Sequence, residues 1–181
     1  MASPRGFTVI GSATVAATSF LRIERIHLAA PDGTAVRRDV VRHPGAVAVV
    51  AVAGGAVALI RQYRAAVDAD VLEIPAGKLD LDGEEPEQAV RRELAEEAGL
   101  VPGELRLLAD FWSAPGFTDE RMRVYLATGC TPTDRIPHGV EEEAAEVVMV
   151  PLEDVRAMIA GGAIGDAKSL VGLLMALGEL G

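Results

Sequence analysis

Residues 45–60 form an almost wholly apolar run of sixteen residues, interrupted by Gly54-Gly55. A membrane-spanning helix needs about 20 apolar residues, so this Val/Ala-rich run is too short and is broken by glycines. Two strands around a two-residue Gly-Gly turn account for it better, and they predict a buried β-hairpin that leads into Arg61-Gln62-Tyr63-Arg64. We therefore expect a core hairpin and no membrane partner.

Shorter alternating stretches precede the hairpin. Residues 20–26 and 36–41 alternate between apolar and polar side chains, and a Pro31-Asp32-Gly33 turn lies between them. This pattern predicts a small antiparallel sheet within residues 7–41. His43-Pro44-Gly45 looks like a joint, so we expect a small N-terminal β-sheet region over residues 1–43 and the main domain over 44–181.

Strands and helices alternate after the hairpin. The pattern predicts strands at 71–77, 104–113, 122–127 and 146–150, and helices at 85–98, 152–160 and 166–180. Pro86 and Gly99 bracket the first helix, and Asp166 is suited to cap the last one. Helices of this length can cover both faces of a sheet, which predicts an α/β fold of the three-layer α/β/α sandwich type.

The predicted helix 85–98 carries three glutamates close together. Its inward stripe would be Ala89, Val90 and Leu94, which leaves Glu93 and Glu97 facing a cleft. Carboxylates four residues apart lie on one helical face and repel each other by a few tenths of a kcal/mol. Such a face suits a hard divalent cation with oxygen ligands, although a solvated acidic surface with arginine partners would produce the same pattern.

Composition limits the classes of function. The 181-residue chain is half hydrophobic and carries a net charge of −10, which argues against a nucleic acid or an anionic membrane as partner. A phosphorylated small molecule could still bind if metal ions and a few arginines invert the field locally. Cys130 is the only cysteine, so no intrachain disulfide can form, and a reducing cytoplasm fits. We expect Cys130 itself to be a small buried hydrophobe.

Residues 77–100 resemble the Nudix box, which reads Gly, five residues, Glu, seven residues, then Arg-Glu-U-x-Glu-Glu-x-Gly-U with U aliphatic. Here Arg92-Glu-Leu-Ala-Glu-Glu-Ala-Gly-Leu100 matches throughout, but six residues separate Gly77 from Glu84. We expect Gly83 to absorb the additional residue. The resemblance implies a Nudix-type α/β/α sandwich with a mixed sheet.

Other segments are similar to the ADP-ribose pyrophosphatase group of that superfamily. They are Gln62-Tyr63-Arg64, the stretch from Glu73 to Gly77, residues 114–120 around Pro115, and residues 162–168. The resemblance implies Mg²⁺-dependent hydrolysis of ADP-ribose to AMP and ribose 5-phosphate, with two or more ions and with Mn²⁺ as a substitute. The alternatives are another nucleoside diphosphate sugar as substrate, or a non-catalytic module that binds ADP-ribose.

The same resemblance implies roles for residues of the motif. Glu93, Glu96 and Glu97 would be metal ligands together with the carbonyl of Ala76, and Glu97 would be essential to catalysis. Arg92 would orient the carboxylates through charge-assisted hydrogen bonds. Gly77, Glu84 and Gly99 would support this arrangement.

An acidic run, Glu141-Glu142-Glu143, follows His138-Gly139, and we expect it to lie in a loop. In the resembling group a glutamate from the corresponding loop activates water, and a neighbour can bind metal. One alignment makes Glu141 the general base and Glu143 a ligand, and another places Glu142 in either role. A flexible, solvated acidic loop is the alternative.

Substrate contacts are expected from three places. Arg64 could face the diphosphate, and Pro115, Gly116 and Phe117 belong to the segment associated with ADP-ribose. The resemblance also implies a homodimer that exchanges its N-terminal sheets, so that Arg38 would serve the partner's site. For each arginine an ordinary surface charge is the alternative. Phe20, Trp112 and Phe117 could stack on adenine, although we expect Trp112 in the core.

Overall fold

The computed structural model describes residues 6–181, and the chain divides into two compact units. The first unit comprises the chain up to Gly45 together with Trp112–Arg121, and the second comprises Ala46–Phe111 and Met122–Gly181. Residues 112–121, which we had assigned to the main domain, therefore group with the N-terminal sheet. Whether residues 1–43 act as a separate region that exchanges between subunits stays a prediction.

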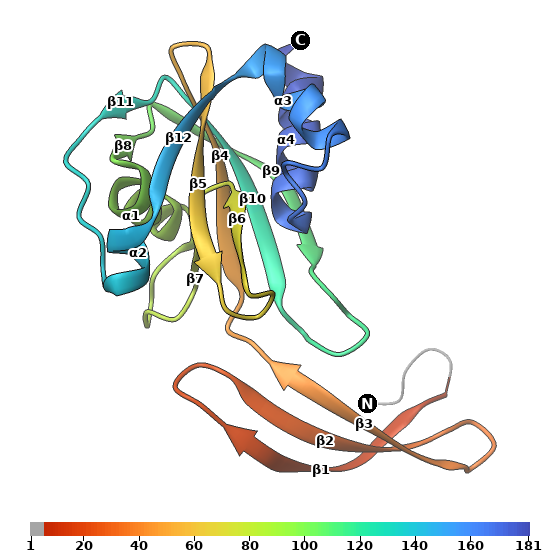
Figure 1. The fold of residues 1–181 in the computed structure, drawn as a ribbon. Coiled ribbons are helices and arrows are strands. Elements are labelled where there is room, and N and C mark those ends of the chain that lie inside the picture. The colour runs from red at the N-terminus through yellow and green to blue at the C-terminus, as the bar shows by residue number, and fades with distance from the viewer. Residues whose placement is uncertain (1–5) are drawn as a thin grey trace. The chain divides into compact units, whose positions relative to one another are not determined.

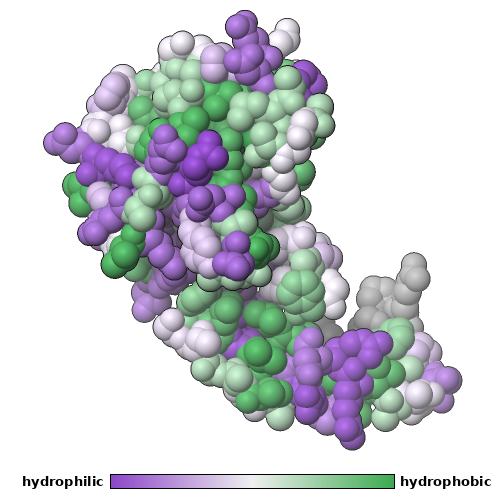
Figure 2. All heavy atoms as spheres, viewed as in Figure 1, coloured by the Kyte–Doolittle hydropathy of each residue, from purple (hydrophilic) through white to green (hydrophobic). Residues whose placement is uncertain are grey.

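The first unit is a three-stranded antiparallel sheet in the order β1-β2-β3, which confirms the predicted small sheet (Figure 1). Its strands are β1 (Thr8–Ala17), β2 (Arg22–Ala29) and β3 (Ala35–Arg42). Apolar and polar side chains lie next to each other on the surface of this sheet (Figure 2). Val9, Ile10 and Val15 of β1 are exposed, so this strand leaves large apolar side chains uncovered in the single chain.

The second unit is built on a mixed sheet. The main path runs β12-β5-β4-β10-β9, with β6 paired to β5 and β7 paired to β4. The β4–β10 pair is parallel, whereas β4–β5, β5–β6, β4–β7 and β5–β12 are antiparallel. The strands are β4 (Ala46–Ala53), β5 (Ala56–Arg64), β6 (Ala69–Glu73), β7 (Ala76–Lys78), β9 (Glu104–Trp112), β10 (Arg121–Thr128) and β12 (Glu146–Pro151).

Strands β4 and β5 form the predicted hairpin, because Ala53 pairs with Ala56 across Gly54-Gly55. Strand β4 lies inside the sheet and is buried on both faces, as expected for a strand covered by helices. Its side chains alternate between two core clusters: one contains Ala46, Ala48 and Val50, and the other contains Val47, Val49 and Ala51.

Helices cover both faces of this sheet, which confirms the α/β/α sandwich (Figure 1). Helix α1 (Pro86–Ala98) packs on one face, and α3 (Leu152–Ala160) and α4 (Ala167–Leu180) pack on the other. Asp166 caps α4 as predicted, by accepting the backbone N–H of Ser169 at 3.0 Å. A two-stranded ladder of β8 (Leu100–Val101) and β11 (Thr131–Pro132) lies after the motif helix in sequence. Within residues 6–181, no helix has the length and apolar character needed to cross a membrane.

The single strand predicted at 71–77 was wrong, because the chain breaks at Ile74-Pro75. Strand β6 pairs with β5, and β7 then pairs with β4. Pro75 has no N–H to donate to a ladder, and the Ile74 N–H donates instead to Ser169 Oγ at 2.9 Å. The chain therefore crosses from one strand to the next immediately before the motif loop.

Two further expectations differ from the structure. Trp112 was predicted in the core, but it is the last residue of β9 and is 57% exposed. The Arg121 guanidinium lies 5.4 Å from the centroid of the Trp112 ring and makes a cation–π contact with it. Cys130 is half-buried rather than fully buried, and this burial raises the pKa of its thiol.

Candidate active site

Helix α1 begins and ends where its sequence predicts. Pro86 is its first residue, and the Glu85 N–H before it donates to Gln88 Oε1 at 2.9 Å. Gly99 ends the helix in the left-handed conformation, with φ of 63°, and its N–H bonds to the Ala95 carbonyl. The predicted inward stripe, which consists of Ala89, Val90 and Leu94, is fully buried.

Glu93 and Glu97 are themselves buried, at 9% and 6% exposure, beneath strand β7. Gly77 of β7 makes room for Glu93, because a Cβ at Gly77 would lie 1.9 Å from the Glu93 carboxyl carbon. The backbone N–H of Ala76 donates to Glu97 Oε2 at 2.9 Å. The end of β7 and the helix thus form one tightly packed unit around the two carboxyl groups.

Burial makes these carboxyls unusually hard to ionise. Desolvation raises the pKa of Glu97 to about 8; the Ala76 N–H opposes this shift, and the charges of Glu93 and Glu142 add to it. Desolvation also raises the pKa of Glu93, with Arg92 acting in the opposite direction. A carboxyl kept from water beside others of the same sign favours a nearby cation.

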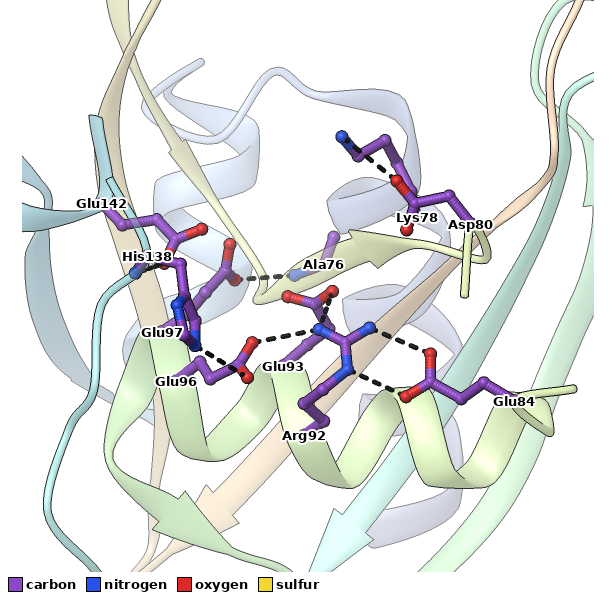
Figure 3. Close-up of polar contacts among 10 residues, drawn as sticks. All are labelled: Ala76, Lys78, Asp80, Glu84, Arg92, Glu93, Glu96, Glu97, His138 and Glu142. Carbon is purple, nitrogen blue, oxygen red and sulfur yellow. Dashed lines mark hydrogen bonds and ion pairs between the residues drawn. The ribbon is translucent and has the colours of Figure 1, made fainter. Parts of the chain in front are cut away.

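Arg92 links the acidic groups at the surface of α1 (Figure 3). Its guanidinium makes a two-bond contact with Glu84, at 2.8 and 3.0 Å, and reaches Glu93 Oε1 at 2.8 Å and Glu96 Oε2 at 3.0 Å. The Glu84 contact is the main reason that the pKa of Arg92 is raised. Gly83 has φ of 77°, so the longer loop turns there and still delivers Glu84.

We predicted that the acidic run lies in a loop, and this was wrong. The run forms the short helix α2 (Val140–Ala144). The three glutamates differ in position: Glu142 is half-buried, and Glu141 and Glu143 are exposed. The charge of Glu142 contributes to the raised pKa of both Glu93 and Glu97. Figure 3 shows Glu142 reaching toward the motif helix, so Glu142 is the member of the run that is brought to the carboxylate cluster.

His138 precedes α2 and bonds to the site at two points. Its backbone N–H donates to Glu142 Oε2 at 2.5 Å. Its ring Nε2 lies 3.2 Å from Glu96 Oε1, although the side chain is mostly exposed. His138 therefore connects the segment before α2 with the motif helix.

Arg64 lies beside the site through an ion-pair network that we did not predict. Its guanidinium binds both oxygens of Glu73, at 2.6 and 2.9 Å, and its charge acts to lower the pKa of Glu97. Glu73 is buried and also binds Lys168 of α4, which lies 3.0 Å from Asp166. The resemblance pointed to segments 73–77 and 162–168 separately. The ion pair between Glu73 and Lys168 could not be predicted from a local pattern, because the two residues are 95 positions apart.

The donor set suits a hard divalent cation. Glu93, Glu97 and the Ala76 backbone lie together at the start of β7, and Glu96 shares the Arg92 guanidinium with Glu93. Oxygen ligands of this kind are those that Mg²⁺ prefers. Burial raises the pKa of Glu97, and a bound cation would stabilise its ionised form. Over residues 6–181, no three acidic, histidine or cysteine side chains already converge as a metal cage, and Arg92 and the Ala76 N–H bond to these carboxylates instead.

The remaining predicted substrate residues lie in the first unit. Arg38 is exposed on β3, and its guanidinium donates to the Arg37 carbonyl at 2.7 Å. Pro115, Gly116 and Phe117 form a turn in which the Phe117 N–H bonds to the Ala114 carbonyl. The Phe117 carbonyl accepts the Val41 N–H, and the Phe117 ring is exposed. A role for these residues at the substrate stays a prediction.

A family model for the NUDIX domain matches residues 41–171, a range that includes α1, β7 and Glu142. The chain belongs to the Nudix family. Its motif departs from the Nudix box only in the longer Gly77–Glu84 loop, and the Glu84–Arg92 contact is nevertheless formed.

Proteins similar to this Nudix chain carry related names. An ADP-ribose pyrophosphatase of Bacillus subtilis is 39% identical over 82% of this chain and 80% of its own length. An ADP-ribose pyrophosphatase of Mycobacterium tuberculosis is 36% identical over 93% of this chain and 82% of its own length. The crystal structure of an ADP compounds hydrolase superposes with a TM-score of 0.83 at 26% identity, and covers 99% of this chain and 97% of that one.

Proposed function

We propose that this protein hydrolyses the diphosphate of ADP-ribose to AMP and ribose 5-phosphate. The observation that carries this proposal is the buried pair Glu93 and Glu97 on the Nudix helix, with Glu142 facing it. The names of the two similar pyrophosphatases support ADP-ribose as the substrate. The alternatives are another nucleoside diphosphate sugar and binding of ADP-ribose without turnover.

Mg²⁺ is the proposed cofactor, with Mn²⁺ as a substitute and with two or more ions. Glu93, Glu96, Glu97 and the Ala76 carbonyl would hold the ions, and Glu143 of α2 is a further proposed ligand. Bound ions would offset the charge of the diphosphate oxygens and make a water molecule more acidic. Arg92 and Glu84 would keep the carboxylates oriented, because their two-bond contact fixes the guanidinium beside Glu93 and Glu96.

The chain's own groups supply the rest of the reaction. Arg64 is held by Glu73 beside Glu97 and attracts the anionic diphosphate. Glu142 accepts a proton from the attacking water. The water oxygen bonds to one phosphorus while the bond from that phosphorus to the bridging oxygen breaks, so the bridging oxygen leaves on the other phosphate. One water is consumed, and the products are AMP and ribose 5-phosphate.

Product analysis tests the substrate and the reaction together. The purified protein is incubated with Mg²⁺ and separately with ADP-ribose, ADP-glucose, GDP-mannose, NADH and dGTP, and the products are separated by chromatography. Formation of AMP from ADP-ribose in preference to products from the others is the expected result. Preferential cleavage of another compound would keep the chemistry and overturn the substrate, and no turnover with any compound would favour the binding module.

A glutamate series tests the general base. Glu142→Gln should lower kcat by about 10²–10⁴-fold, the usual contribution of general acid–base catalysis, with little change in KM. Glu141→Gln is the matched control in the same helix, and we expect a smaller effect because its side chain is exposed. Glu143→Gln removes a proposed metal ligand, so it tests Mg²⁺ affinity instead. A larger loss in Glu141→Gln than in Glu142→Gln would transfer the role of base to Glu141.

We also propose a homodimer in which the N-terminal sheet contacts a second copy and Arg38 serves the partner's site. The exposed apolar side chains of β1 support such a contact, because large apolar groups at a surface favour association. Light scattering at micromolar concentration should give twice the mass of one chain, and a monomeric mass would remove the shared-site role of Arg38. The single cysteine supports a reducing compartment, and the cytoplasm is the proposed location.

A further inference from the structure

Arg135 joins the ends of two helices through three backbone carbonyls. Its Nε donates to the Glu97 carbonyl at 2.7 Å, its Nη2 to the Glu142 carbonyl at 2.5 Å and its Nη1 to the Ala145 carbonyl at 3.1 Å. Glu97 lies in the last turn of α1, and Glu142 and Ala145 lie at the end of α2. Carbonyls at a helix C-terminus carry partial negative charge, and most of them lack donors within the helix. A guanidinium is therefore well suited to these carbonyls, although that of Glu142 also accepts the Ala145 N–H.

The chain before Arg135 is attached to the end of α1 step by step. Strand β11 pairs with β8, which directly follows the motif helix. The Thr133 N–H then donates to the Gly99 carbonyl at 2.8 Å. Gly99 permits this approach, because a Cβ there would lie 3.0 Å from the Thr133 carbonyl oxygen. Arg135 is the next attachment, and it is the one that reaches α2.

Besides Arg135, helix α2 is attached by the His138 N–H bond to the Glu142 carboxylate and by contacts with β5. It has five residues, none of which is buried, and a helix this short is not stable by itself in water. Backbone bonds from Glu143 to Gly139 and from Ala145 to Glu142 close single turns within it. Its C-cap Ala145 is buried, and its carbonyl is one of those that Arg135 holds.

We propose that Arg135 is a positioning residue for the reaction: it holds α2 against the end of α1 so that the Glu142 carboxylate faces Glu93 and Glu97. The inference rests on the proposed function, because Glu142 is there the general base. Arg135 bonds to backbone carbonyls, so it acts on the reaction through the backbone of Glu142. The His138 N–H, which donates to Glu142 Oε2, fixes the carboxylate itself, and Arg135 fixes the backbone that carries it.

Amide hydrogen exchange tests the placement of α2 without any turnover. In Arg135→Met, the amides of Glu143 and Ala145 should exchange faster than in the wild-type protein, while those of α4 stay unchanged. Arg135→Lys should lie between the two, because one ammonium group cannot match three carbonyls in the way a planar guanidinium does. Arg156→Met is the control, since Arg156 is an exposed arginine on α3, on the other face of the sheet. Unchanged exchange at Glu143 and Ala145 would overturn the proposal.

A double-mutant cycle on kcat tests the catalytic consequence. Arg135→Met should lower kcat by about a hundred-fold with little change in KM, the size expected when a reacting group is misplaced by about 1 Å. In a Glu142→Gln background the same change should cost almost nothing, because the misplaced base is already absent. Equal losses in both backgrounds would show a general structural role and would overturn the proposal.

The two measurements separate this proposal from the proposed function. Wild-type turnover of ADP-ribose with an additive cycle keeps the reaction and rejects positioning by Arg135. Absence of wild-type turnover with every compound rejects the reaction, and with it the part of the proposal that assigns Glu142 as base. If Arg135→Met does not fold, Arg135→Lys serves in both measurements.

Discussion

Gly77 of β7 lies so close to Glu93 of α1 that a methyl group at position 77 would occupy the space of the carboxyl group. The Cβ would lie 1.9 Å from both Cδ and Oε1 of Glu93, and 2.4 Å from its Cγ. The first glycine of the Nudix box and the first glutamate of its helix are therefore matched in space. The motif requires a glycine at position 77 because the buried Glu93 carboxylate occupies the space that a side chain at this position would need.

Gly77→Ala should displace Glu93 while the protein still folds, because the obstructing atoms belong to the end of a flexible side chain. We expect a loss of about 1–3 kcal/mol in the free energy of unfolding, typical of overpacking, and a clear loss of Mn²⁺ or Mg²⁺ affinity measured by calorimetry. Gly178→Ala is the matched control in α4, where a Cβ would meet nothing within 4 Å. It should stabilise the helix by about 0.5–1 kcal/mol. Wild-type metal affinity in Gly77→Ala would contradict the role of Glu93.

Glu97→Gln should separate metal binding from folding. A divalent ion present at about 100 times its dissociation constant should stabilise the wild-type protein by about 2.7 kcal/mol, measured by thermal unfolding with and without a chelator. The variant should lose most of this gain and at least about a hundred-fold in kcat, which corresponds to ~3 kcal/mol of lost transition-state stabilisation. In the chelator its stability should not fall, because a neutral amide avoids the cost of holding an ionisable carboxyl out of water.

Glu104→Gln, an exposed position on β9, is the control for that experiment. It should keep both the metal-dependent stabilisation and the turnover. Near-normal activity of Glu97→Gln would remove Glu97 from the set of metal ligands.

Glu73 should make the stability of the protein sensitive to acid. Burial acts to raise the pKa of Glu73, but Arg64 and Lys168 outweigh it, so the pKa is lowered from 4.5 in the folded state. A lowered folded pKa means that the stabilisation is complete above the unfolded value and is lost as the pH falls through the folded one. Urea unfolding should therefore show a falling free energy below about pH 4.5, and Glu73→Gln should weaken this dependence.

At pH 7 the same variant should lose about 1–3 kcal/mol, because the partly exposed Arg64 and the mostly buried Lys168 lose their shared carboxylate, while Lys168 keeps Asp166. Glu146→Gln provides the control, since the Arg61–Glu146 pair is exposed and should be worth about 0–1 kcal/mol. Equal losses in the two variants would show that burial of the Glu73 network is not what stabilises it.

Ser169→Ala should weaken the connection between α4 and the turn before β7. The Ser169 hydroxyl is fully buried, accepts the Ile74 N–H at 2.9 Å and donates to Asp166 Oδ2 at 2.5 Å. Alanine would leave the Ile74 N–H without this acceptor and should cost about 1–3 kcal/mol, measured by urea unfolding. Ser12→Ala, at an exposed position of β1, should change the stability by less than about 0.5 kcal/mol. If Ser169→Ala changed the stability as little as Ser12→Ala, another group would have to accept the Ile74 N–H.

Local sequence patterns were sufficient to predict the helix and the hairpin that hold the site. The limits of α1 follow from Pro86 and Gly99, its buried stripe follows from the spacing of Ala89, Val90 and Leu94, and the hairpin follows from the Gly54-Gly55 turn. These features are encoded by neighbours in sequence, since capping, periodicity and turn chemistry act over only a few residues. The Nudix box belongs to the same class, because its helix and loop are contiguous.

Contacts between distant residues decided the rest. The sequence alone left Glu141, Glu142 and Glu143 equivalent. The structure distinguishes Glu142, because it is half-buried and its carboxylate accepts the His138 N–H. The pairing of Glu73 with Lys168 across 95 positions and the exposure of Trp112 likewise depend on where strands and helices meet. The physical reason is that the direction of a side chain, its burial and the charges around it are set by tertiary neighbours, whereas periodicity and capping are set by the chain itself.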